Sequence, residues 1–109
     1  MDAPTEVFEQ LRRIEGLIDR AADVCDADPS VPLEVKERVR QLDDETDATK
    51  YEYLLENDRY AIGDHVEAIE QLLEEARDAC ERSEQVDAAI GNVLSEATRE
   101  VGDLRRRLH

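Results

Sequence analysis

Apolar residues recur every three or four positions along most of this chain, and polar residues fill the places between them. Such spacing puts the apolar side chains on one face of an α-helix. In the first stretch the repeating positions are Val7, Leu11, Ile14, Leu17, Ala21 and Cys25. The pattern predicts a helix that ends at residues 26–30, because Pro29 disfavours helix at the residue before it.

Three further stretches show the same period. The second is expected to start near Ser30 or Val31, with Pro32 in its first turn, and to run to Leu55. The polar run 43–47 lies inside it, but the apolar positions keep their phase on both sides, so one continuous helix is predicted. A turn is expected at 56–58, followed by one helix up to Cys80 and another to Leu108.

The lengths of these segments predict the architecture. Helices of roughly 20 residues joined by short connections pack antiparallel. We therefore expect one domain, 1–109, that is all-α and forms an antiparallel four-helix bundle with a core of Leu, Ile, Val and Ala. Two tandem helical hairpins that dimerise are the alternative arrangement.

A shift of 55 residues aligns the two halves of the chain, 1–55 and 56–109. It places Val7 on Ile62, Leu11 on Val66 and Cys25 on Cys80. Any two helical hairpins share an apolar stripe, so the apolar matches alone carry little weight. The matching cysteines are harder to explain in that way, and an internal repeat stands as a hypothesis.

Charge and composition narrow the class of protein. The chain has 29 acidic and 14 basic residues, a formal net charge of −15, and only 4% aromatic residues. A surface this negative repels phosphate, so no nucleic acid is expected as a partner. No apolar run approaches a membrane span and no export signal is seen, so we expect a cytoplasmic protein without membrane contact. The basic residues are twelve Arg and two Lys, which fits either high-salt adaptation or a GC-rich genome.

Cys25 and Cys80 form a candidate thiol pair. In an antiparallel bundle their two helices run in the same direction, so both thiols lie at one end. Each continues an apolar stripe, which favours buried thiols that act as small hydrophobic residues. A disulfide between the halves is the alternative, although the cytosol is reducing and diagonal helices are far apart for such a bond.

No catalytic motif is present, and we expect neither an enzyme nor a cofactor. The chain has no glycine-flanked serine and no glycine-rich phosphate loop. No Glu lies three residues before His65, so the ferritin-like di-iron pattern is absent. Two alternatives stay open: phosphotransfer through His65, and metal binding by the carboxylates Glu67, Glu70 and Glu74.

Acidic residues outnumber basic ones sixteen to four between 43 and 87. The three tyrosines of the chain lie within this acidic stretch, and tyrosine is enriched at protein interfaces. We therefore expect a non-catalytic interaction, adaptor or assembly protein. Its partner is another protein, which is basic if the acidic stretch is the docking surface, or a second copy of the chain in a homodimer. A chaperone-like holder of a basic client is the alternative. The candidate contact residues are Tyr51, Tyr53, Tyr60, Asp43, Asp44 and Glu45.

Overall fold

The computed structural model describes residues 4–56, 59–83 and 88–108. These residues form four helices and no strand: α1 (Pro4–Ala27), α2 (Leu33–Glu56), α3 (Arg59–Arg82) and α4 (Ala88–Leu108). The predicted all-α four-helix fold is confirmed. The second helix runs without a break through the polar stretch 43–47, as the unbroken phase of its apolar positions predicted.

Helix α2 begins at Leu33, two or three residues later than the predicted start at Ser30 or Val31. Asp28 Oδ1 accepts hydrogen bonds from the backbone N–H of Ser30 (2.9 Å) and from its hydroxyl (2.6 Å). This local bonding holds residues 28–31 in a turn, where Val31 N–H donates to the Asp28 carbonyl at 3.2 Å. Lys36 N–H then donates to the Pro32 carbonyl, so Pro32 precedes the helix as its N-cap.

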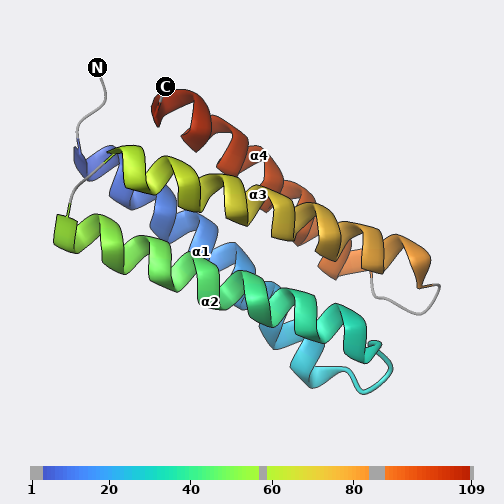
Figure 1. Ribbon diagram of the computed structural model, residues 1–109. Coiled ribbons are helices and arrows are strands. Elements are labelled where there is room, and N and C mark those ends of the chain that lie inside the picture. The colour runs from blue at the N-terminus through green and yellow to red at the C-terminus, as the bar shows by residue number, and fades with distance from the viewer. Residues whose placement is uncertain (1–3, 57–58, 84–87, 109) are drawn as a thin grey trace.

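Adjacent helices in the sequence lie side by side, and α1 also packs against α4 (Figure 1). The diagonal pairs are farther apart: among the described residues, no Cα of α1 is within 8 Å of a Cα of α3. The bundle measures 43 × 21 × 18 Å. Since α1 and α3 run in the same direction, the start of α1, the α2–α3 junction and the end of α4 share one end of the molecule (Figure 1).

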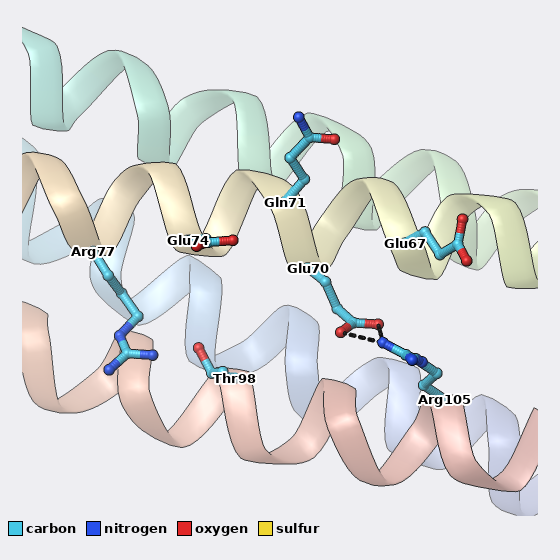
Figure 2. A pocket seen from close by; sticks show the side chains of 7 residues that line it. All are labelled: Glu67, Glu70, Gln71, Glu74, Arg77, Thr98 and Arg105. Atoms are coloured by element: carbon cyan, nitrogen blue, oxygen red, sulfur yellow. Dashed lines mark hydrogen bonds and ion pairs between the residues drawn. The ribbon is translucent and has the colours of Figure 1, made fainter.

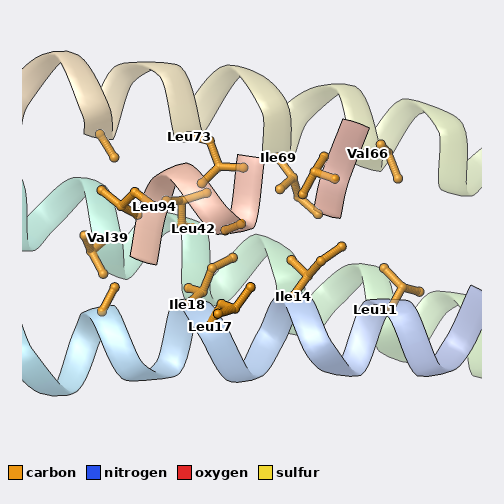
Figure 3. Close-up of a cluster of buried hydrophobic side chains, with 14 of the residues drawn as sticks. Leu11, Ile14, Leu17, Ile18, Val39, Leu42, Val66, Ile69, Leu73 and Leu94 are labelled. Carbon is orange, nitrogen blue, oxygen red and sulfur yellow. The ribbon is translucent and has the colours of Figure 1, made fainter. Parts of the chain in front are cut away.

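The core is built from the predicted stripes (Figure 3). Within it α2 differs from the other helices, because it contributes two threonines. Thr46 and Thr49 are fully buried, and their hydroxyls donate to the carbonyls of Leu42 and Glu45, both at 2.7 Å. The helix therefore satisfies these polar groups itself. The buried residues of α2 are Val35, Val39, Leu42, Thr46, Thr49 and Tyr53.

None of the helices, over the part of the chain that the structure describes, is both long enough and apolar enough to cross a membrane.

Candidate functional site

The three consecutive acidic residues Asp43, Asp44 and Glu45 do not form one surface. Each residue of a helix is turned by roughly 100° from the one before it. Asp43 is half-buried and faces Asp19 of α1, whereas Glu45 is half-buried and contacts His65 of α3. Of the three side chains, only that of Asp44 is exposed.

Asp43 belongs to a cluster of carboxylates between α1 and α2. A hydrogen bond with the carboxyl of Asp19, burial and the neighbouring charges raise the pKa of Asp43 to about 7. Burial and a hydrogen bond with Glu15 raise the pKa of Asp47 as well. Lys50 Nζ lies 2.7 Å from Glu15 Oε2. Burial acts to raise the pKa of Glu15, but the contact with Lys50 lowers it overall.

His65 bridges α3 to α2 through both of its ring nitrogens. Nδ1 lies 2.9 Å from Glu45 Oε1, and Nε2 contacts Glu52 Oε2. The hydrogen bond with Glu45 and the charge of Glu52 raise the pKa of His65, against the opposing effect of burial. With both nitrogens facing carboxylates, neither is free in this arrangement to attack a phosphoryl group.

A groove of about 450 Å³ lies between α3 and α4 (Figure 2). It contains the three carboxylates that the sequence offered as metal ligands, together with Gln71, Arg77, Thr98 and Arg105. Arg105 Nη1 is 3.1 Å from Glu70 Oε2, so one carboxylate is already paired. Among the described residues, no group of three or more His, Cys, Asp or Glu side chains is arranged to hold a metal ion.

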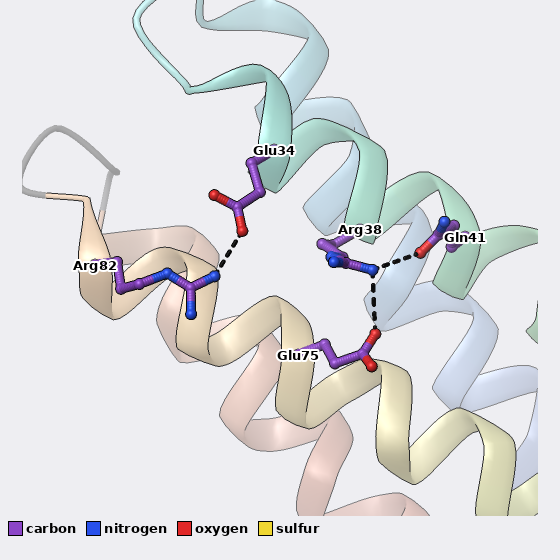
Figure 4. A network of polar contacts seen from close by, with 5 residues as sticks. All are labelled: Glu34, Arg38, Gln41, Glu75 and Arg82. Carbon is purple, nitrogen blue, oxygen red and sulfur yellow. Dashed lines mark hydrogen bonds and ion pairs between the residues drawn. The ribbon is translucent and has the colours of Figure 1, made fainter.

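Ion pairs also link α2 and α3 at the opposite end of the bundle from their junction (Figure 4). Arg38 Nη1 is 3.2 Å from Glu75 Oε2, and Arg82 Nη2 is 2.6 Å from Glu34 Oε1. Their side chains are 38% to 62% exposed, and such exposed pairs contribute about 0–1 kcal/mol each. These contacts orient the two helices and offer no reactive group.

Both cysteines are free thiols. Cys25 is buried and Cys80 is half-buried at the same end of the bundle. Burial and the neighbouring Cys80 raise the pKa of Cys25 to about 11. Burial also raises the pKa of Cys80. Their Cα atoms, on α1 and α3, are more than 8 Å apart, which is beyond the reach of a disulfide without backbone movement.

The tyrosines are not equivalent. Tyr53 is 4% exposed and fills the core, so it has no surface to offer a partner. The side chain of Tyr60 lies outside the described residues. Tyr51 is 61% exposed, and Lys50 Nζ sits 5.5 Å from the centre of its ring, at the distance of a cation–π contact.

All the large apolar side chains that are exposed belong to α2, among those the structure describes. They are Leu33, Tyr51, Leu54 and Leu55. The two adjacent leucines are not among the contact residues predicted from the sequence. A usable signal was present, because Tyr53 continues the buried stripe and the next two residues must then lie on other faces of the helix.

Comparisons of the chain with models of known protein families, with curated proteins and with solved structures find no match.

Proposed function

We propose that this protein is a non-catalytic interaction protein that binds a basic, amphipathic segment of a partner protein on the outer surface of α2. The surface, here called the α2 docking face, consists of Asp44, Ala48, Tyr51, Leu54 and Leu55. All five side chains are exposed.

The observation that carries this proposal is the exposure of three large apolar side chains at one end of one helix. Tyr51, Leu54 and Leu55 are 61%, 55% and 84% exposed. Positions 44, 48, 51 and 55 follow helical spacing and form a single stripe, and Leu54 flanks it. Contiguous exposed apolar groups of this kind are typical of interaction sites. Lys50 Nζ lies 5.5 Å from the centre of the Tyr51 ring, so the surface also has a cation–π contact beside its apolar groups.

The chemistry of the partner follows from charge. The chain carries a formal charge of −15, and Asp44 lies in the same stripe as the apolar groups. A basic partner gains attraction at long range and faster encounter, whereas an acidic partner or a nucleic acid is repelled. A helix with leucines on one face and lysines on the other meets both requirements. Both cysteines are free thiols, as is usual for proteins in a reducing compartment. We therefore include a cytoplasmic location in the proposal.

A synthetic amphipathic helix of leucine and lysine is the probe that tests this function. Its affinity is measured by calorimetry for the wild-type chain and for Leu54→Ser/Leu55→Ser. We expect the double variant to bind about tenfold more weakly or worse, because two apolar anchors are lost. Leu33→Ser is the matched control, since Leu33 is 69% exposed on the same helix but at the other end, and it should bind like wild type. The same peptide with glutamate in place of lysine should not bind.

Two results would overturn the docking face. Equal binding by the double variant and wild type, with steep loss of affinity in salt, would indicate a holder that recognises basic clients by charge alone. A wild-type dimer in light scattering that Leu54→Ser/Leu55→Ser converts to a monomer would show that a second copy covers this surface.

A further inference from the structure

The last residues of α1 and α3 follow the 55-residue shift. Helix α1 ends at Ala27 and α3 ends at Arg82, 55 residues later, and both ends lie inside the described residues. Each half of the chain contributes two consecutive helices, so the hairpin α1–α2 can be compared position by position with the hairpin α3–α4.

The ion pair inside each hairpin follows the same shift. In the first hairpin Lys50 Nζ is 2.7 Å from Glu15 Oε2. In the second, Arg105 Nη1 is 3.1 Å from Glu70 Oε2. Residues 15 and 50 become residues 70 and 105, so the two pairs join equivalent positions of equivalent helices.

The polar contacts between the hairpins follow it too. Gln10 Nε2 on α1 donates to the carbonyl and to Oε2 of Glu100 on α4, both at 3.2 Å. His65 Nδ1 on α3 is 2.9 Å from Glu45 Oε1 on α2. Residue 10 becomes 65 and residue 45 becomes 100. In both cases a nitrogen of the first helix of one hairpin meets a glutamate on the second helix of the other.

An apolar stripe does not dictate these polar contacts. Two unrelated hairpins share buried positions whenever both are amphipathic, but their charged and amide side chains need not occupy matching places. Here the α1–α2 interface has its counterpart in α3–α4, and the α1–α4 interface has its counterpart in α3–α2. The bundle thus has a pseudo-two-fold relation between its halves.

The buried side chains of α2 and α4 are compatible with this relation. Leu42, Thr46 and Thr49 are buried in α2, and Ala97, Val101 and Leu104 are buried at the corresponding positions of α4. The leucine is the first of the three residues in α2 (Leu42) and the last of the three in α4 (Leu104). Each set therefore presents a similar total volume to the facing hairpin, which is the condition that core packing imposes.

The correspondence also has departures. The carboxyl pair Asp19–Asp43 has Glu74 and Thr98 at the shifted positions, and Glu52, which contacts His65, has Arg107. Two ion pairs depart as well. The pairs Arg38–Glu75 and Arg82–Glu34 lie between α2 and α3 (Figure 4). Their counterparts between α4 and α1 would involve Val93, Arg20, Ala27 and Ala89, which cannot form them. These pairs are surface contacts, so the buried part of each interface is not affected.

We propose that the face between the two hairpins is self-complementary, so that a second copy of this chain can pair with it, first hairpin to first and second to second. In such a dimer Gln10 of one copy meets Glu45 of the other, and His65 meets Glu100. Gln10 Nε2 and His65 Nδ1 still face a carboxylate, and the buried stripes still face each other. The α2 docking face takes no part in this pairing.

Mixed refolding of single-cysteine chains tests the pairing. One chain carries Gln10→Cys and the other Glu45→Cys, both with Cys25→Ala and Cys80→Ala. They are unfolded, mixed and refolded at about 1 mM, which matches the effective concentration that a short linker gives the competing intramolecular pairing. A short bismaleimide should then link one chain of each kind into a species of twice the mass. A mixture with Arg12→Cys in place of Gln10→Cys is the control, since residue 12 is exposed.

Light scattering of the wild-type chain after the same refolding supplies a second measurement that needs no substitution. A dimer should be present, and Leu54→Ser/Leu55→Ser should form it equally well. Cross-linking no greater than in the Arg12→Cys control, or a wild-type chain that refolds only to monomer at about 1 mM, would overturn the proposal. Neither result bears on peptide binding by the docking face.

Discussion

Neighbouring acidic residues on α2 lie in different surroundings because a helix turns each of them toward a different side. Asp43 faces the carboxyl of Asp19 on α1, whereas the side chain of Asp44 is exposed to water. Two carboxylates that share a hydrogen bond retain a proton more tightly than an isolated one. The folded state therefore disfavours the ionised form of Asp43.

Replacing Asp43 by Asn should stabilise the protein at pH 8. The pKa of Asp43 is about 7 in the folded chain against 3.8 for an ordinary Asp, so folding loses stability as pH rises through this interval. We expect Asp43→Asn to raise the free energy of unfolding at pH 8 by on the order of 1 kcal/mol, after allowance for solvent screening. Near pH 4 the gain should disappear, because Asp43 is then protonated in the folded state. Urea unfolding at both pH values measures this, and Asp44→Asn is the exposed control.

His65 should stabilise the bundle in acid and not in base. Its folded pKa is raised above 6.5 by Glu45 and Glu52, so its contribution is complete below about 6.5 and is lost as pH rises through the folded value. The melting temperature of wild type minus that of His65→Gln should fall steadily between pH 5 and pH 9. A difference that does not change with pH would show that the two glutamate contacts do not depend on the charge of His65.

At the scale of the element, α2 shows what the sequence could and could not predict. The buried stripe from Val35 to Tyr53 and the unbroken course through 43–47 both followed from period alone. The start at Leu33 did not, because the side chain of Asp28 stabilises a turn that competes with the helix.

The candidate site was predictable only in part for a different reason. The spacing of apolar residues assigns each residue to a face of its own helix. It does not say which residue of another helix lies opposite. The contacts of Asp43 with Asp19 and of His65 with Glu45 and Glu52 join positions 13 to 24 residues apart. Tyr51 was identified from composition, whereas Leu54 and Leu55 required the phase of Tyr53 to be followed to the end of the helix.

Leucines on the two faces of α2 should respond oppositely to truncation. Leu42 is fully buried, so Leu42→Ala should lower the free energy of unfolding by about 2–5 kcal/mol. Leu55 is 84% exposed, so Leu55→Ala should change it by no more than about 0.5 kcal/mol. Urea unfolding with both variants checks the assignment of the faces. A large loss for Leu55→Ala would mean that this side chain is buried in solution, as it would be in a dimer formed through the α2 docking face.

For the whole molecule, the excess of negative charge should make stability depend on salt. With a formal charge of −15, the compact state suffers self-repulsion that salt screens. The melting temperature should therefore rise between low salt and about 1 M NaCl, where the screening length is roughly 3 Å. Asp43→Asn should show a smaller rise, since it removes one of the clustered charges. A melting temperature that falls with salt would mean that the ion pairs outweigh the repulsion.

The most direct test of the interaction role is to locate a bound segment on the folded chain. Backbone amide NMR signals are followed while the leucine–lysine peptide is added to the ¹⁵N-labelled protein. The largest shifts should fall on residues 44–55 of α2. Shifts centred on the α3–α4 groove, around Glu67, Glu74 and Thr98, would contradict it, and so would the absence of any shift.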